Sequence, residues 1–106
     1  MARFLILWRT NLAAPWPTDA SKAMKLNETM WAAIDKFKKE GVLEDFGFFP
    51  NATSGYAIGK GEATDVFARV NMFLPYMHGE VHEIIPYEKG KGILREVMTK
   101  IAAAQK

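Results

Sequence analysis

The sequence contains no cysteine, so it can form neither a disulfide framework nor a thiolate metal site. It also has no long apolar run, because Phe4-Leu5-Ile6-Leu7-Trp8 is too short for a membrane span or for the core of a signal peptide. An excess of one charge is missing too, since 14 basic and 12 acidic residues leave a net charge of +2. We therefore expect a soluble, cytoplasmic protein without membrane association.

Features of nucleic-acid-binding proteins are absent as well. The lysines alternate with acids, as in Asp35-Lys36-Phe37-Lys38-Lys39-Glu40, which is typical of a solvated helix face. There is no basic cluster and no aromatic pair in an RNA-recognition pattern. Nucleic acid is therefore not an expected partner. The 106 residues are enough for a single domain, residues 1–106, around one hydrophobic core.

Residues 2–10 are rich in β-branched and aromatic side chains, which favours a strand. Alternation places Phe4, Ile6 and Trp8 on one face, and Leu5 and Leu7 on the other. Both faces are apolar, so we expect this strand to be central and covered on both sides.

The rest of the chain divides into further elements with recognisable ends. Thr18 or Asp19 can cap a helix that reaches Glu40 and stops at Gly41. Its apolar stripe is Ala23, Asn27, Met30, Ile34 and Phe37; a later helix has the stripe Ala63, Val66, Phe67, Val70 and Phe73. The expected elements after the first helix are a strand hairpin over 42–49 and 55–59, a helix over 62–73, a strand over 78–85, and a C-terminal helical extension over 88–106.

Within that extension, we interpret Lys89-Gly90-Lys91-Gly92 as a loop. The helix is expected to begin at Ile93, with Leu94, Val97, Met98 and Ile101 on one side, and the tail from Ala102 to Lys106 is expected to fray.

This order predicts an α+β fold of the ferredoxin-like βαββαβ type with a C-terminal helix. Right-handed crossovers would place both main helices on one face of a four-stranded antiparallel sheet. The other face would carry one of the two apolar sets of the first strand. Because soluble monomers rarely expose a large apolar face, we expect two sheets to pair in a dimeric α+β barrel, as a homodimer or a multiple of dimers.

The densest cluster of usable chemistry is the triplet His78, Glu80 and His82, which falls on one face of the last strand. These side chains could move protons in a cavity, with His78, His82 or Glu80 as acid or base. Two histidines at i and i+2 could also share a metal, or could point to solvent. We expect no metal and no cofactor. Asp45, in an apolar strand, is best explained by exposure at the edge of the sheet.

A family resemblance rests on several short motifs. The motifs are Lys22-Ala23, Leu26, Lys39-Glu40-Gly41, Tyr56 and above all Phe73-Leu74-Pro75-Tyr76-Met77 followed by Glu80-Val81. In these motifs the chain resembles the muconolactone isomerase family over roughly residues 1–85. The resemblance implies a dimeric α+β barrel and a cofactor-free isomerase that moves a proton on an unsaturated lactone. Lys22 and Tyr76 match the family's pattern. At the positions of its acidic and histidine proton carriers, this chain has Glu28-Thr29-Met30 and Asn51-Ala52-Thr53.

Two classes of function therefore lead the alternatives. The first is acid–base chemistry on a small unsaturated acid or lactone, with His78, Glu80, His82 and Tyr76 as catalytic candidates. Its candidate substrate-binding residues are Arg9, Lys22 and Trp8. The second is a non-catalytic barrel that binds a small molecule or serves as an oligomeric interaction module. The sequence predicts the fold more firmly than the reaction, because a fold does not define a function.

Overall fold

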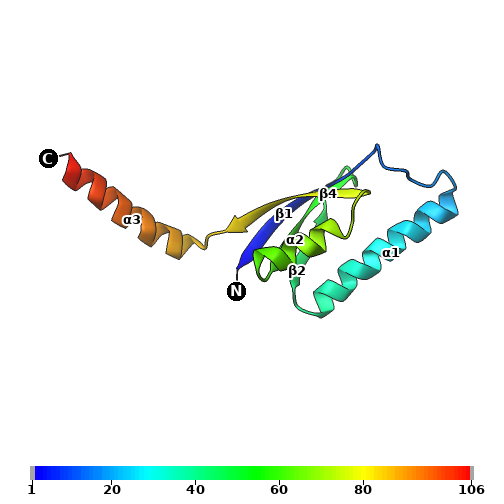
Figure 1. Cartoon of the computed structure of the whole chain (residues 1–106), viewed down its shortest axis with the longest axis horizontal. Helices are drawn as coiled ribbons and strands as arrows, with labels where there is room; N and C mark the ends of the chain where they lie inside the picture. Colours follow the sequence, from blue (N-terminus) through cyan, green and yellow to red (C-terminus); the bar gives the residue numbers. More distant parts are fainter. Residues whose placement is uncertain (1, 106) are drawn as a thin grey trace.

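The computed structural model describes residues 2–105 of the chain. Seven helices and strands follow one another in the predicted order (Figure 1). They are β1 (Arg3–Thr10), α1 (Ala20–Lys39), β2 (Leu43–Phe48), β3 (Ser54–Lys60), α2 (Ala63–Asn71), β4 (Met77–Ile84) and α3 (Tyr87–Ala104).

The four strands form one antiparallel sheet in the order β2-β3-β1-β4. This is the strand order of the ferredoxin-like fold, and α1 and α2 lie on the same face of the sheet, where they line a common cavity. The predicted fold class is therefore confirmed. β1 is central, as its two apolar faces predicted, and β2 and β4 are the edge strands.

The two ends of α1 follow from local sequence. A carboxylate oxygen of Asp19 accepts hydrogen bonds from the backbone N–H of Ser21 at 2.8 Å and of Lys22 at 3.3 Å. The Ser21 hydroxyl also bonds to Asp19 and, with these amides, lowers the pKa of the Asp19 carboxyl. At the other end, Gly41 has a φ of 78°, a conformation that favours glycine after a helix. Both predicted helix boundaries are confirmed.

The core lies between the sheet and the helices. Phe4, Ile6 and Trp8 of β1 are buried on this side, together with Leu43, Ala57 and Val66. Leu5 and Leu7 point to the opposite face, where Leu7 is 36% exposed. We call that side the open face, because no helix covers it in the described chain.

Glycines allow the sheet and its aromatic residues to approach closely. A Cβ on Gly55 would lie 2.0 Å from the carbonyl oxygen of Gly47 and 2.4 Å from the Trp8 ring. A Cβ on Gly47 would meet the ring of Tyr56. Only residues without a side chain fit at these two positions, which makes them part of the packing of β2 against β3.

The two main helices pack against the sheet less tightly than their patterns suggest. No residue of α1 is buried, although the predicted stripe, from Ala23 to Phe37, is its less exposed side. In α2, Val66 is 3% exposed, but Phe67 is 70% exposed. The prediction that Phe67 faces the core is wrong, because it lies one residue beyond the buried position on the outer side of a short helix.

The C-terminal extension differs from its prediction. α3 begins at Tyr87 and includes Gly90 and Gly92, so the expected loop at 89–92 is wrong. Glycine in a helix costs only about 1 kcal/mol relative to alanine, which the surrounding helix formers offset. Ala102–Ala104 belong to the last turn; Lys106 lies outside the described residues.

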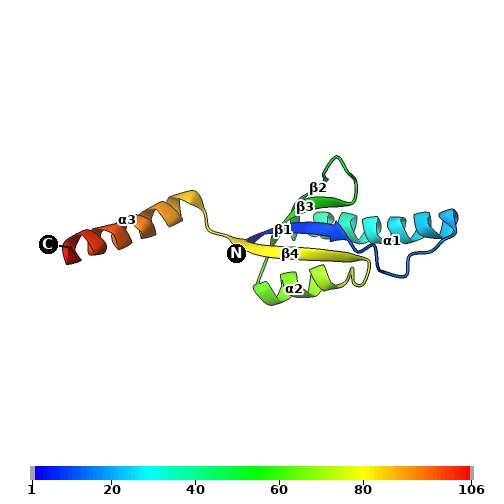
Figure 2. The ribbon, with the colours of Figure 1, turned by 90° about the horizontal axis from the view of Figure 1, so that it is seen from above.

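α3 projects away from the sheet, so the molecule measures 69 × 29 × 25 Å (Figure 2). Two residues, Ile85 and Pro86, join it to β4. Within residues 2–105, no helix combines the length and the apolar character required to cross a membrane.

Candidate functional site

A cavity of about 300 Å³ lies between the sheet and the helices α1 and α2. Its size is at the lower end of the range for pockets that hold small molecules. Ile34 and Phe37 of α1 pack against the core, but no residue of α1 is fully buried, so the helix leaves space above the strands. The lining is mainly aromatic and aliphatic and includes Trp8, Trp16, Trp31, Phe37, Phe46, Phe48, Phe73, Met30, Ile34 and Met77.

The sheet side of the cavity is an aromatic cluster on β1 and β2. The ring of Trp8 stacks on Phe46 with centroids 5.4 Å apart and an angle of 3° between the planes. Phe48 meets both rings edge-on, at 5.5 Å from Trp8 and 5.7 Å from Phe46. The Trp8 indole N–H donates to the carbonyl of Tyr56 at 3.3 Å, which fixes the orientation of the ring. This cluster offers a bound molecule flat apolar surfaces.

One end of the cavity is formed by the segment between β1 and α1. Asn11 holds this segment to the start of β4. Its backbone N–H donates a hydrogen bond to the Tyr76 carbonyl at 2.8 Å, and its side-chain amide donates one to the Pro75 carbonyl at 2.9 Å. The indole N–H of Trp16 donates to the Asn11 carbonyl at 2.7 Å. Trp16 also packs on Tyr76, with ring centroids 4.8 Å apart. These two contacts therefore hold the Trp16 ring in place at the end of the cavity.

Few polar side chains line the cavity. Arg69 of α2 donates from Nη1 to the carbonyl oxygen of Lys60 at 3.0 Å, and it is the one arginine or lysine among the described lining residues. Asn27 of α1 is half-buried and makes no side-chain hydrogen bond to another described residue. The Thr10 hydroxyl contacts the sulfur of Met77 at 3.8 Å. His78 of β4 borders the cavity as well. Arg69, Asn27 and His78 are thus the groups best suited to orient a bound molecule.

The triplet His78, Glu80 and His82 occupies alternate positions of β4, as predicted, and the register with β1 places it on the open face. His78, at the start of the strand, nevertheless also borders the cavity. In the register with β1, Glu80 is opposite Leu7 and His82 is opposite Leu5. Glu80 Oε1 lies 3.5 Å from His82 Nε2, and their side chains are 62% and 54% exposed. Met77 and Gly79 of β4 line the cavity too, and a Cβ on Gly79 would meet Val70 and Ile6.

The other predicted site residues are dispersed. Trp8 lines the cavity, whereas Arg9 pairs with His78 in the strand register and is exposed on the open face. Lys22 is exposed in the first turn of α1. Tyr76 supports Trp16 from outside the cavity. Among the described residues, the structure therefore brings only His78 and Trp8 of the catalytic and substrate-binding candidates to the cavity.

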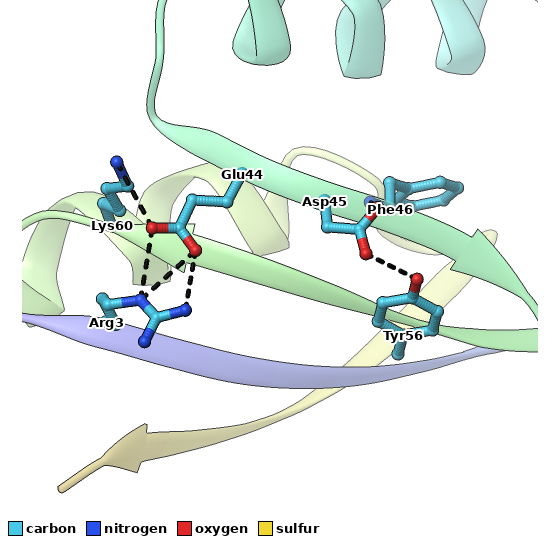
Figure 3. A network of polar contacts seen from close by, with 6 residues as sticks. All are labelled: Arg3, Glu44, Asp45, Phe46, Tyr56 and Lys60. Atoms are coloured by element: carbon cyan, nitrogen blue, oxygen red, sulfur yellow. Dashed lines mark hydrogen bonds and ion pairs between the residues drawn. The ribbon is translucent and has the colours of Figure 1, made fainter. Parts of the chain in front are cut away.

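The open face carries two polar networks (Figure 3). Glu44 bridges two cations across the strands, with Arg3 Nη2 at 2.8 Å and Lys60 Nζ at 3.3 Å. The hydrogen bond from Arg3 lowers the pKa of the Glu44 carboxyl, and the same contact raises the pKa of Arg3. These three residues join β1, the start of β2 and the end of β3.

In the second network, the hydroxyl of Tyr56 donates to Asp45 Oδ2 at 2.6 Å. This hydrogen bond lowers the pKa of Asp45, with a smaller contribution from the backbone N–H of Phe46, and raises the pKa of Tyr56. Asp45 is exposed on the edge strand β2, which confirms its prediction. A partnered carboxylate at the sheet edge avoids the penalty of an unpaired one.

Metal binding has no support in the arrangement of side chains. In the part of the chain that the structure describes, no group of three histidine, aspartate or glutamate side chains lies close enough to hold an ion. The cavity residues that sequence reasoning missed are Phe46, Phe48, Arg69 and Asn27. Asn27 was detectable, because an amide within an otherwise apolar helix stripe indicates a polar position facing inward.

Comparison with known proteins adds no family assignment. No family model matches the chain, and no curated protein matches it significantly.

Proposed function

We propose that the protein binds a small, flat, mainly apolar acid in the cavity between the sheet and the two main helices. The observation that carries this proposal is the cavity of about 300 Å³, whose lining combines stacked aromatic rings with a few polar groups. Pockets of this kind bind small molecules through apolar contact and use isolated polar groups for orientation. An aromatic or conjugated ring fits beside Trp8 and Phe46.

The guanidinium of Arg69 is the reason why we propose a negatively charged ligand. One nitrogen of its guanidinium is engaged by the Lys60 carbonyl, and the remaining donors are suited to a carboxylate. Asn27, from the opposite wall, supplies an amide that can donate or accept. A small unsaturated or aromatic carboxylic acid therefore satisfies both the apolar and the polar groups of the cavity.

Cofactor-free acid–base chemistry of the muconolactone isomerase type is the second candidate. One observation favours it: Glu80 and His82 form a close pair, with 3.5 Å between the carboxylate oxygen and the ring nitrogen. Such a pair can transfer protons once it is shielded from water. Shielding would require a second copy on the open face, and the resemblance to that family motivates a lactone as the substrate.

A homodimer through the open face remains our proposal for assembly. Leu7 is 36% exposed and Phe49 is 40% exposed on this side of the sheet, in a setting that also contains the Arg3–Glu44–Lys60 network. Pairing of two such faces would bury the apolar residues and desolvate the Glu80–His82 pair.

Tryptophan fluorescence provides a direct test of ligand binding. The chain has three tryptophans, and all three, Trp8, Trp16 and Trp31, line the cavity. Titration with benzoate, cinnamate and an unsaturated lactone, alongside benzamide and cinnamide as uncharged analogues, should quench or shift the emission. We expect the acids to bind at least tenfold more tightly than the amides, because the amides lack the charge that Arg69 recognises.

Two variants of α1 act as a matched pair in this experiment. Met30→Trp fills the cavity and should abolish binding, whereas Met24→Trp adds the same side chain at a position that is 53% exposed and outside the cavity lining. Thermal shift with the same compounds follows binding without relying on the new tryptophan. The proposal fails if no compound binds up to millimolar concentration, or if Met30→Trp binds as well as the parent.

A further inference from the structure

α3 lacks the packing that a helix of its kind needs. Its apolar side is unpartnered in the described chain: Ile93, Leu94, Val97, Met98 and Ile101 are 44–63% exposed. The two glycines lower its intrinsic stability by about 1 kcal/mol each relative to alanine. Because helices in proteins are stabilised mainly by packing of their apolar side, α3 requires a surface to lie against.

The same chain has an uncovered apolar groove of matching character. It lies between α2 and the edge strand β4, on the helix side of the sheet, and we call it the α2–β4 groove. Phe67 and Leu74 form one wall, and Val81 of β4 forms part of the floor; these three residues are 70%, 47% and 39% exposed. The groove is open because α2 has only nine residues and leaves the outer side of β4 bare.

We propose that α3 of each chain packs into the α2–β4 groove of a second copy, so that two chains exchange their C-terminal helices. In this arrangement α3 joins α1 and α2 of the other chain as a third helix over the sheet. The lengths agree: 18 helical residues span about 27 Å, and the eight residues of β4 span about 26 Å. One reciprocal contact would cover both unpartnered apolar surfaces of each chain.

The direction in which α3 leaves the sheet favours a second copy over the same chain. α3 continues past the end of β4 instead of turning back over it (Figure 1, Figure 2). The link consists of Ile85 and Pro86 alone, and proline fixes one of its dihedral angles. A two-fold axis near this link places each α3 beside β4 of the other chain without reversing the path of either.

Charge supports the same pairing. α3 has a net charge of +2, from Lys89, Lys91, Arg95 and Lys100 against Glu88 and Glu96. Of the two acidic residues of β4, Glu83 lines the groove, whereas Glu80 is on the open face. The opposite charges favour docking of α3 along β4.

A membrane surface fits α3 less well than a second copy. Helices that lie on membranes carry lysine and arginine on the polar side and Trp, Phe or Leu on the other. The polar side of α3 includes Glu88 and Glu96 as well as basic residues, and its apolar side has Leu94 but no tryptophan or phenylalanine. This mixed polar side is typical of contact with protein.

Sedimentation equilibrium of the full chain tests the contact from both sides. Leu94→Asp on α3 and Phe67→Asp in the groove should each remove one association step or raise its dissociation constant at least tenfold. Thr99→Asp, on the polar side of α3, and Leu7→Asp, on the open face, are the controls and should leave this step unchanged. Association that is insensitive to both Leu94→Asp and Phe67→Asp would overturn the proposal.

Crosslinking identifies the partner surface, and the absence of native cysteine makes it unambiguous. A chain with Phe67→Cys is mixed with a chain with Leu94→Cys and treated with a bis-maleimide. We expect a covalent pair of unlike chains. If crosslinks form only between two Leu94→Cys chains, α3 pairs with another α3. If they form within one chain that carries both substitutions, α3 docks onto its own groove. Either result overturns the proposal.

Co-sedimentation with vesicles of phosphatidylcholine and phosphatidylserine covers the membrane alternative. We expect no binding by the parent chain. Vesicle binding that is lost in Leu94→Asp, together with no association of chains in solution, would assign α3 to a membrane surface and overturn the exchange of helices.

Discussion

The Tyr56 hydroxyl lies 2.6 Å from Asp45 Oδ2, so two residues of neighbouring strands share a short hydrogen bond on the open face of the sheet. The bond requires a protonated phenol and an ionised carboxylate. The bond therefore couples the titration of the Asp45 carboxyl to that of the much weaker acid, the Tyr56 phenol. Each group keeps the other in the form in which the bond exists.

Removal of the phenol hydroxyl should raise the pKa of Asp45. In the parent, the Tyr56 hydrogen bond holds this pKa below 3.8, and Tyr56→Phe eliminates its largest cause. Carbon NMR of the Asp45 carboxyl across acid pH measures the change directly. Tyr76→Phe is the control, because that phenol has no recorded bond to Asp45 and the Asp45 titration should stay where it is.

The hydrogen bond between Tyr56 and Asp45 stabilises the fold only over a limited pH range. Asp45 has a lowered pKa in the folded chain, so its contribution is present above 3.8 and is lost as pH falls through the folded value. Tyr56 has a raised pKa, so its contribution is present below 10.0 and is lost as pH rises through the folded value. The difference in melting temperature between parent and Tyr56→Phe should therefore be greatest between these limits and shrink outside them.

Gly55→Ala should destabilise the protein by about 1–3 kcal/mol or more, because the new methyl group would collide with a backbone oxygen and the Trp8 ring. Gly59→Ala, in the same strand, is the matched control, since its Cβ would meet nothing closer than 3.5 Å. Urea denaturation measures both. Equal stability of the two variants would show that the close approach of Gly55 to Gly47 and Trp8 is not real.

The order of strands and helices was predictable because each element has its own period and its own end signals. Asp19 and Gly41 bound α1, and the alternation of β1 identified it as the central strand. The helix start at Tyr87 was not predictable from local signals, since Gly90 and Gly92 resemble a loop when read without their helical neighbours.

The candidate site was harder to predict than the fold. Alternation correctly grouped His78, Glu80 and His82, but it does not state which face of a strand the helices cover. That choice depends on tertiary packing, which sets Gly79 against Val70. The place of Arg69 at the cavity was not predictable for a similar reason, because the sequence around a single arginine on a helix does not indicate which side of the helix borders a cavity.

Muconolactone isomerisation should be weak or undetectable in the purified protein. Neither Glu28, which is exposed on α1, nor any residue at 51–53 supplies a proton carrier in the cavity. Ultraviolet absorbance of the lactone over time gives the rate. Robust turnover that is lost on Glu80→Gln or His82→Gln, yet retained in the cavity-filling Met30→Trp, would place the chemistry on the open face and contradict this prediction.

The Arg3–Glu44–Lys60 network should affect titration more than stability. Arg3→Gln should raise the pKa of Glu44, since the Arg3 hydrogen bond is the largest cause of its lowered value. The fold should remain intact, because exposed ion pairs contribute little and the Arg3 side chain is 48% exposed. NMR titration of Glu44 tests the first expectation, and the melting temperature in low and high salt tests the second.

The floor of the cavity includes Ala57, Gly59 and Gly79, residues with a methyl group or no side chain at all. At these positions, beside the rings of Trp8 and Phe46, the backbone that the sheet holds in register sets the depth of the cavity, whereas long side chains of α1 such as Met30 form its roof. A roof of flexible side chains can adapt to molecules of different outline, but a backbone floor cannot recede. The cavity should thus discriminate strongly against thick ligands but weakly between ligands of different outline. We expect it to bind flat rings and to exclude bulky saturated ones.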